Sequence, residues 1–532
     1  MPNASFERSS NGNGLISGRV LDARQGTPLE DVEVQLHDER RRTLVEHSRT
    51  DPDGRFRLAN ILPGRYSLGV RHNPYVPVGK VLSLGPGEQL LDLEFRLITS
   101  GAFVGKIVNE SGKPLSGIGI HALVKASTSR LFNGEALAVM PELDLAPIRT
   151  AVTNDLGEYR LYGLPPTPYF LCAVDSGMPH LSEQMLGGVM FSPEDLSRSK
   201  YPPIFHPGTP EKDRALAVTL GSGEEKRVDF HLQRFTTRTV EGDVVDPDAK
   251  PAVGVFVHAM PLDMVTLFGG LQLSSLTDSE GHFKIVSVPP GKYILRATQI
   301  RGGEERTFAD LKLDVREQEQ ETRDVRLTLR RGQKLSGKIL VEGGSQFDLG
   351  QIHVWLTPLD QDLQHFDTAA AQVKSDGAFD TNRDLADTVY GIHLTGLPED
   401  WYLKSARLAN EDVLLRGLTI SADVAPASLQ LLVAPDGTRV RGTVRRDDQP
   451  PDAAALALQL EPANYHRFTA CGFTDQRGEC EFRGVPPGNY RLNVNALPSA
   501  LTFSEEKLKD FPSTSMLLTA KAGETLMVTI KL

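Results

Sequence analysis

The stretch SGRVLDARQGTPLEDVEVQL (residues 17–36) contains the pattern that predicts the fold of this chain. In its second half Val32, Val34 and Leu36 alternate with polar residues. A period of two residues is typical of a strand that buries one face. A polar turn with a proline separates this strand from the one before it. The stretch therefore predicts two short strands of a β-sandwich.

The stretch TDPDGRFRLANILPGRYSLGV (residues 50–70) follows and adds a turn of defined chemistry. The side chain of Asp51 caps such a turn, and Gly54 supplies the positive φ that the turn needs. We interpret the turn as a hairpin. Pro-Gly then precedes a strand in which Tyr66 alternates with Leu68. A tyrosine in this place predicts a structural corner with a hydrogen-bonded hydroxyl, and not a catalytic group.

The same unit recurs through the chain. A strand with a glycine opens each copy, as SGRV, VGKIV, EGDVV, SGKIL and RGTV, with the glycines at positions 18, 105, 242, 337 and 442. The turn returns as TDPDGRF, TNDLGEY, TDSEGHF, KSDGAF and TDQRGEC. The strand after it returns as NILPGRYSLGV, GLPPTPYFLCAV, SVPPGKYILRA, GLPEDWYLKSA and GVPPGNYRLNV. Five copies in 532 residues predict an all-β tandem array of about five small sandwiches.

The two quoted stretches resemble the carboxypeptidase regulatory-like domain. That domain is an immunoglobulin-like or transthyretin-like sandwich, grouped with the carbohydrate-binding-like and Cna B-type folds. The resemblance is specific in copies one, three and five, altered in copy two, which has long loop insertions, and diverged in copy four. The expected division is a disordered N-terminus at 1–14, followed by sandwiches at 15–99, 100–234, 235–331, 332–435 and 436–532.

Composition narrows the classes of partner. The formal net charge is -11, and the basic residues are scattered, so a nucleic-acid partner is not expected. No run approaches the length of a transmembrane helix, and the N-terminus MPNASFERSSNGNG lacks the apolar core of a secretory signal. The resemblance to tandem-repeat proteins of environmental bacteria implies an extracellular, periplasmic or cell-surface location. The short linkers between copies predict a semi-rigid rod.

The sequence names no catalytic residue, cofactor or metal site. A His-x-x-Glu pair occurs once, at His180 and Glu183, inside an insertion and without a separate catalytic domain. DPDG at residues 51–54 lacks the later ligands of a calcium loop. The histidines are dispersed, and His121 and His258 occupy matching strand positions where packing is the expected role. We therefore expect a protein that is not an enzyme.

The three cysteines raise one question. Cys172 lies in an apolar run and is expected in a core. Cys471 and Cys480 flank the turn of copy five, where a hairpin would put them opposite each other. A disulfide and two separate half-buried thiols both remain open.

Two functions fit these observations. The first is a noncatalytic extracytoplasmic structural or binding protein, with an unknown protein or polysaccharide as partner. The second is carbohydrate recognition, which the starch-binding-like fold suggests. Ligand contacts are expected on loops or outer faces, and the candidate residues are Trp355, Trp401 and Tyr402 in copy four and Tyr201, Phe205 and His206 in the insertion of copy two. For Trp355 and for the aromatic residues of the insertion, the pattern nevertheless favours packing onto their own sandwich over exposure.

Overall fold

The structure is a computed structural model, and nearly all regular secondary structure of the described residues is β-strand. It describes residues 13–39, 43–125, 145–175, 201, 203–210, 212–234, 238–262, 273–301, 305–316, 321–344, 347–360, 363, 367–421, 426–446, 449, 453–461, 469–497 and 513–532. Most of the predicted disordered N-terminus lies outside the described residues, while β1 already begins at Gly14.

The strands fall into five groups, which we call modules 1 to 5. Module 1 contains β1 (Gly14–Asp22), β2 (Glu33–Asp38), β3 (Leu44–Arg49), β4 (Arg55–Ile61), β5 (Gly64–Arg71), β6 (Val78–Leu84) and β7 (Gln89–Leu97). Module 2 contains β8 (Gly101–Asn109), β9 (Gly119–Lys125), β10 (Leu145–Val152), β11 (Glu158–Leu164), β12 (Pro168–Val174), β13 (Ile204–Phe205), the 3₁₀ turn η2 (Lys212–Arg214), β14 (Val218–Thr219), β15 (Glu225–Arg227) and β16 (Phe230–Leu232). Module 3 contains β17 (Arg238–Val245), β18 (Phe256–Pro261), β19 (Leu273–Leu276), β20 (His282–Val288), β21 (Gly291–Arg301), β22 (Glu305–Val315), β23 (Glu321–Thr328) and β24 (Arg330–Arg331).

The last two modules complete the chain. Module 4 contains β25 (Ser336–Val341), the 3₁₀ turns η3 (Glu342–Gly344) and η4 (Leu349–Gln351), β26 (His353–Pro358), β27 (Ala369–Gln372), β28 (Ala378–Asp380), β29 (Val389–Thr395), β30 (Tyr402–Leu408), β31 (Glu411–Asp412), β32 (Leu418–Thr419) and β33 (Leu429–Ala434). Module 5 contains β34 (Thr438–Arg445), β35 (Ala453–Glu461), β36 (Thr469–Phe473), β37 (Glu479–Val485), β38 (Gly488–Leu497), β39 (Ser513–Ala520) and β40 (Thr525–Lys531).

Each module is a sandwich of two sheets around its own hydrophobic core. In module 1 the strand orders are β4-β1-β7 and β3-β2-β5-β6. The predicted inward residues Val32, Val34 and Leu36 are fully buried in that core. Modules 2 to 5 each have two sheets and a separate core of the same kind. The expected all-β array of about five sandwiches is therefore confirmed, whereas the precise residue boundaries stay a prediction.

The first strand of each module is a central strand of one sheet, which we call the outer sheet. β1 pairs with β4 in the antiparallel sense and with β7, the last strand of the module, in the parallel sense. The same parallel pairing recurs in the other modules, with the last strand in modules 2, 4 and 5 and with β23, the strand before the short β24, in module 3. The remaining sheet of each module is called the inner sheet. This pairing brings the two ends of every module together.

The recurring glycine of the opening strand has a packing reason in the first three modules. The parallel partner of β1 shifts its register between Ile16 and Gly18, and this irregularity aims a carbonyl at the glycine. A Cβ on Gly18 would lie 2.1 Å from the Leu93 carbonyl oxygen, and a Cβ on Gly105 would lie 1.9 Å from that of Val228. In module 5 the register is regular, and a Cβ on Gly442 would first meet a leucine side chain at 3.2 Å.

The turn at Asp51 to Gly54 is built as predicted but does not form a hairpin. The Asp51 carboxylate accepts hydrogen bonds from the backbone amides of Asp53 at 3.0 Å and Arg55 at 2.8 Å. Gly54 has a φ of 74°. However, β3 before the turn lies in the inner sheet and β4 after it lies in the outer sheet. The turn therefore connects the two layers of the sandwich, and the hairpin interpretation is wrong.

The repeated tyrosine forms the predicted corner. In modules 1, 2, 3 and 5 its hydroxyl donates to the carbonyl four residues earlier, as Tyr66 to Leu62 at 2.7 Å, Tyr169 to Pro165 at 2.7 Å, Tyr293 to Pro289 at 2.8 Å and Tyr490 to Pro486 at 2.7 Å. All four rings are buried. Burial raises the pKa of Tyr293 above its ordinary value, so the hydroxyl stays protonated as a donor.

Removing one corner hydroxyl is expected to weaken its module. Tyr293→Phe leaves the Pro289 carbonyl without its donor in a buried place, so the free energy of unfolding of module 3 should fall by about 1–2 kcal/mol. Hydrogen exchange in the full chain measures the change, in module 3 peptides for Tyr293→Phe and in module 2 peptides for the control. Tyr162→Phe is the matched control, because the Tyr162 side chain is 65% exposed. Equal effects of the two variants would contradict the structural role of the corner.

Module 4 departs from the pattern and corrects one sequence alignment. The stretch GLPEDWYLKSA was matched to the Tyr66 region, but the corner tyrosine of this module is Tyr390, whose hydroxyl accepts from the Ala386 amide at 2.9 Å. Tyr402, in the matched stretch, begins β30, and β30 belongs to the outer sheet. The sequence before Tyr390, LADTVY, lacks the prolines that precede the corner tyrosine in the other modules, so the repeat pattern pointed to the wrong tyrosine.

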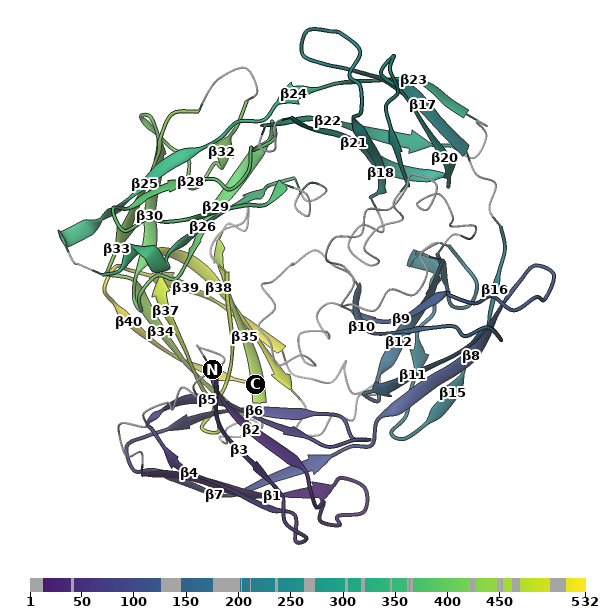
Figure 1. Ribbon diagram of the computed structural model, residues 1–532. Coiled ribbons are helices and arrows are strands. Elements are labelled where there is room, and N and C mark those ends of the chain that lie inside the picture. Colours follow the sequence, from purple (N-terminus) through teal and green to yellow (C-terminus); the bar gives the residue numbers. More distant parts are fainter. Residues whose placement is uncertain are drawn as a thin grey trace, which may run out of the picture.

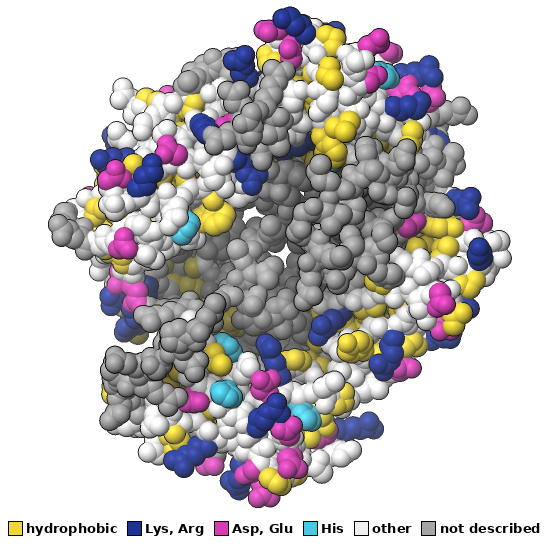
Figure 2. Space-filling model, in the orientation of Figure 1, with side chains coloured by type: hydrophobic (Ala, Val, Ile, Leu, Met, Phe, Trp, Pro, Cys, Tyr) yellow, Lys and Arg dark blue, Asp and Glu magenta, His cyan; other side chains and the backbone are white. Residues whose placement is uncertain are grey.

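The five modules form a ring, not the predicted rod (Figure 1). In the view of Figure 1 the inner sheet of each module faces the middle of the ring and the outer sheet faces away. Module 5 returns to module 1, and Arg477 of module 5 pairs with Glu88 of module 1 at 2.5 Å. On the face shown in Figure 2, basic and acidic side chains are interspersed. Short linkers limit motion at each joint, but they do not fix the direction in which the array bends.

Specific contacts hold the joints between consecutive modules. At the joint of modules 3 and 4, Arg296 on β21 pairs with Asp310 at 2.7 Å and with the buried Asp367. At the joint of modules 4 and 5, Arg439 donates to Asp400 at 2.8 Å. Between modules 1 and 2, the backbone carbonyl of the linker residue Thr99 accepts a hydrogen bond from the Gly223 amide at 3.1 Å. Specific hydrogen bonds and ion pairs therefore connect the modules at these three joints.

Candidate functional site

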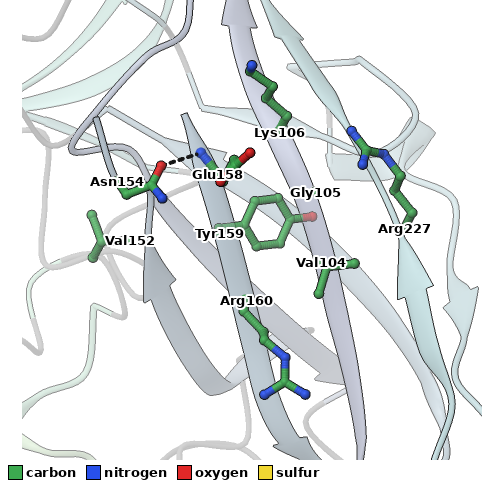
Figure 3. A pocket seen from close by; sticks show the side chains of 9 residues that line it. All are labelled: Val104, Gly105, Lys106, Val152, Asn154, Glu158, Tyr159, Arg160 and Arg227. Carbon is green, nitrogen blue, oxygen red and sulfur yellow. Dashed lines mark hydrogen bonds between the residues drawn. The ribbon is translucent and has the colours of Figure 1, made fainter. Parts of the chain in front are cut away.

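A shallow pocket opens on the outer sheet of module 2 (Figure 3). Its volume is about 370 Å³. The pocket is lined by Val104, Gly105, Lys106, Val152, Asn154, Glu158, Tyr159, Arg160 and Arg227. Lys106, Arg160 and Arg227 come from the neighbouring strands β8, β11 and β15, so three cations surround a surface that contains the Glu158 carboxylate.

Two of the three cations are already paired. Arg160 meets Glu225 at 3.1 Å, and Arg227 meets Asp229 at 2.9 Å. The Asn154 side-chain oxygen accepts a hydrogen bond from the Glu158 backbone amide at 2.8 Å and so stabilises the turn. None of the described lining residues is a serine, cysteine or histidine. The pocket can hold a small polar or anionic group, but it has no nucleophile paired with a base.

Sequence reasoning did not find this pocket. Its cations stand at outward positions of three strands that are distant in sequence, and such positions are normally solvated surface. The signal was the alternation in VGKIV and EYRLYGL, which turns Lys106 and Arg160 away from the core. Nothing in the sequence, however, shows that these two strands and β15 lie side by side.

The candidate Trp355 lies on the inner sheet of module 4. Its neighbours Val354 and Leu356 are buried in the core, so Trp355 belongs to the opposite face, where it is half-buried. The ring stacks on His393 with 6.2 Å between centroids and 8° between planes. Its indole nitrogen donates to the Thr395 hydroxyl at 3.1 Å. Trp355 and His393 thus form a flat aromatic surface outside the core.

The two other candidates of module 4 lie elsewhere. Trp401 packs on Phe347, with 4.7 Å between ring centroids, and its backbone carbonyl faces Gly484 of module 5. Tyr402 is 5% exposed, and burial together with Asp436 raises its pKa to about 12. These two residues belong to the joint with module 5, and the structure does not join them to Trp355 in one surface.

The aromatic residues of the copy-two insertion require a correction. Tyr201 is 4% exposed and Phe205 is 1% exposed, so neither forms an open contact surface. Phe205 lies on β13, which pairs with β12, and its side chain packs on Cys172 and Leu123. Burial of these large apolar side chains explains the difference. His206 is half-buried, and burial lowers its pKa.

Of the two alternatives for Cys471 and Cys480, the disulfide is absent, because Cys480 is a free, buried thiol. Cys480 lies on β37 of the outer sheet, and Cys471 lies on β36 of the inner sheet. The turn between them crosses from one layer to the other, so the two residues are not hairpin partners. Burial raises the pKa of the Cys480 thiol to about 12, which disfavours a reactive thiolate. Cys172 is also free and buried, as expected.

The two histidines at matching strand positions, His121 and His258, have a packing role. His121 on β9 and His258 on β18 are half-buried at matching places of two inner sheets. Burial lowers the pKa of each to about 4, so both rings are neutral at physiological pH. The His180 and Glu183 pair lies outside the described residues. Within the described ranges, no three histidine, cysteine, aspartate or glutamate side chains form a group suited to a metal ion.

Comparison with known proteins identifies the first module. The family described as carboxypeptidase regulatory-like domain matches residues 15–98. No curated protein matches the sequence. Among the described residues, no helix has the length and apolar character needed to cross a membrane.

Several solved structures align with the chain at low similarity. The Bacillus anthracis TIE protein is 10% identical, with 97% of this chain and 73% of that chain covered and a TM-score of 0.15. A streptococcal ancillary pilin is 12% identical, with coverages of 60% and 99% and a TM-score of 0.23. BcpA, the major pilin subunit of Bacillus cereus, is 14% identical, with coverages of 60% and 99% and a TM-score of 0.15. Whole chains do not superpose at such scores, so these neighbours say nothing about the partners of this chain.

Proposed function

We propose that this chain, which carries a carboxypeptidase regulatory-like domain at residues 15–98, is a noncatalytic structural or binding protein that acts outside the cytoplasm. The observation that carries the proposal is the ring itself. The buried charged side chains Arg296 and Asp367, which are of a type that active sites use, pair with each other at the joint between modules 3 and 4. The recurring tyrosines serve corners within them. The repeated elements are thus used to build a scaffold.

A binding screen with product analysis tests this function. The full chain is applied to immobilised glycans, peptidoglycan and extracellular proteins, and bound material is examined by mass spectrometry. A scaffold or binding protein returns its ligand chemically unchanged. If the protein converts a ligand to product, and this activity persists after the protein has been purified again, the noncatalytic role is contradicted.

A second candidate function, carbohydrate recognition, is favoured by the Trp355 surface. A flat aromatic ring on a sheet face offers an apolar platform, and sugar rings present apolar faces to such platforms. Polar side chains lie next to it, because His353 on β26 pairs with Gln372 on one side and with Thr395 on the other. Trp355 therefore has both stacking area and hydrogen-bonding groups within reach.

The carbohydrate hypothesis predicts a graded effect at position 355. If the screen finds a polysaccharide ligand, Trp355→Ala should weaken its binding by about tenfold, equivalent to ~1.4 kcal/mol, while Trp355→Phe should retain part of the affinity. Tyr162→Ala removes an exposed aromatic ring from module 2 and serves as the control. Isothermal titration calorimetry gives the affinities. Unchanged binding in Trp355→Ala would place the sugar site elsewhere.

A further inference from the structure

The contact that closes the ring recognises backbone atoms of module 1. β6 is the edge strand of the inner sheet β3-β2-β5-β6. The Gln476 side chain from the module 5 turn satisfies both polar groups of Ser83 on this edge: it accepts the Ser83 amide at 3.0 Å and donates to the Ser83 carbonyl at 2.7 Å. A carboxamide has one acceptor and one donor side by side, so it matches one residue of an open strand edge.

Charged groups surround this pair of hydrogen bonds. Arg477 pairs with Glu88 at 2.5 Å. Arg65, which lies opposite Ser83 on β5, donates to the carbonyl of Phe473 at 2.5 Å and to that of Glu479 at 3.4 Å. Phe473 and Glu479 stand at the two ends of the turn, so one guanidinium holds both ends. A hydrogen bond from the Gly85 amide and the pairing with Arg477 lower the pKa of Glu88, which keeps this carboxylate charged.

Only one of the five turns has the residues for this contact. The turn positions of Gln476 and Arg477 hold Pro52 and Asp53 in module 1, Asp155 and Leu156 in module 2, Ser279 and Glu280 in module 3, and Ser375 and Asp376 in module 4. None of these pairs combines a carboxamide with a cation. Three of them would bring an acidic side chain toward Glu88, where like charges repel. The chemistry of the turn therefore distinguishes module 5 from the other modules.

We propose that the edge of module 1 formed by Arg65, Ser83 and Glu88 is a binding site selective for the Gln476-Arg477 turn, whether that turn belongs to the same chain or to a second copy. The two surfaces differ, so the contact is head-to-tail, and such a contact closes a ring or joins further copies. The covalent connection through modules 2 to 4 gives the turn of the same chain a high effective concentration. Closure within one chain is therefore the state at low protein concentration. The proposed contact is one between parts of the chain itself and is independent of which ligand the chain binds.

The Ser83 amide gives a direct measurement of closure in the full chain. Because its hydrogen bond goes to Gln476, its exchange with solvent should accelerate by at least about tenfold in Gln476→Ala and in Arg477→Glu. Small-angle scattering should show a larger radius of gyration for both variants. Ser279→Ala and Glu280→Gln change the matching turn of module 3 and should alter neither quantity. Unchanged Ser83 exchange and unchanged dimensions in Gln476→Ala and Arg477→Glu would overturn the proposal.

A charge exchange tests binding between copies. Glu88→Arg alone and Arg477→Glu alone each place like charges at the closing contact, so each variant should open. A mixture of the two variants restores one opposite-charge pair at each of its two intermolecular contacts. Sedimentation velocity should then detect a one-to-one complex in the mixture and monomers in each variant alone. The double variant Glu88→Arg/Arg477→Glu should regain the compact dimensions of the closed ring. Absence of a complex in the mixture would refute binding between copies, and failure of the double variant to close would refute the role of this charge pair.

Discussion

Arg296→Ala is expected to lower the stability of the joint between modules 3 and 4 by about 3–5 kcal/mol, because it leaves the buried carboxylate of Asp367 without its cation. The Arg296 side chain is 6% exposed and that of Asp367 is 4% exposed. Burial disfavours the charged guanidinium, but hydrogen bonds to Asp310 and the attraction of Asp367 outweigh it and raise the pKa of Arg296. The guanidinium is therefore charged in the folded chain. Burial raises the pKa of Asp367 and the attraction of Arg296 opposes that effect, so removal of Arg296 leaves a buried carboxyl group without its partner.

The same joint supplies a matched control. Lys312 and Asp360 also form an ion pair between modules 3 and 4, at 3.5 Å, but their side chains are 60% and 39% exposed. Lys312→Ala should therefore cost no more than about 1 kcal/mol. Chemical unfolding with hydrogen exchange across both modules measures the two variants. The double variant Arg296→Ala/Asp367→Ala removes both buried charges and should recover part of the loss. Equal costs for Arg296→Ala and Lys312→Ala would contradict this account.

Gly105→Ala is the second change with a large expected effect. The added methyl group would lie 1.9 Å from the Val228 carbonyl oxygen and 2.8 Å from the Tyr159 ring. The carbonyl belongs to the backbone, so the strands have to separate, and we expect a loss of about 2–3 kcal/mol in the stability of module 2. Tyr159 donates its hydroxyl to this same carbonyl at 2.6 Å, so the displacement also disturbs a buried hydrogen bond.

Gly442→Ala tests whether the position or the local register is responsible. Gly442 holds the same place in the repeat, but a methyl group there would contact only the flexible Leu456 side chain below 3.4 Å. Alanine also loses less conformational freedom on folding than glycine, by about 0.5–1 kcal/mol. Gly442→Ala should therefore be close to neutral. If both substitutions destabilise their modules equally, the carbonyl contact is not the reason for the glycine.

The sequence predicted the features that depend on local pattern. Strand alternation identified the buried Val32, Val34 and Leu36, and turn chemistry identified the positive φ of Gly54, because a period of two and a left-handed turn each need only a few neighbouring residues. The tyrosine corner spans five residues and was found for the same reason. Around Tyr390 the local sequence differs from the repeat, and there the predicted position of the corner tyrosine was wrong.

Features that depend on distant contacts could not be predicted. The closing contact joins Arg65 to Phe473, which are 408 residues apart, and neither residue is unusual in its local sequence. The layer crossing that separates Cys471 from Cys480 has the same turn chemistry as a hairpin, so the turn alone did not distinguish them. The burial of Phe205 depends on pairing of β13 with β12 across a long insertion. In each case the deciding partner lies far away in the sequence.

The parallel pairing of first and last strands has a consequence for how the chain folds. In module 1, Gly18 on β1 finds its partner Leu93 on β7 only after the intervening strands have been made. Contacts of such long sequence separation make folding slow, because the loop must close before they form. On the ribosome each module should therefore complete its outer sheet only when its last strand emerges, and the modules should mature in order from the N-terminus. The module 1 edge formed by Arg65, Ser83 and Glu88 should therefore be folded and exposed to solvent until the ribosome has synthesised the turn that contains Gln476.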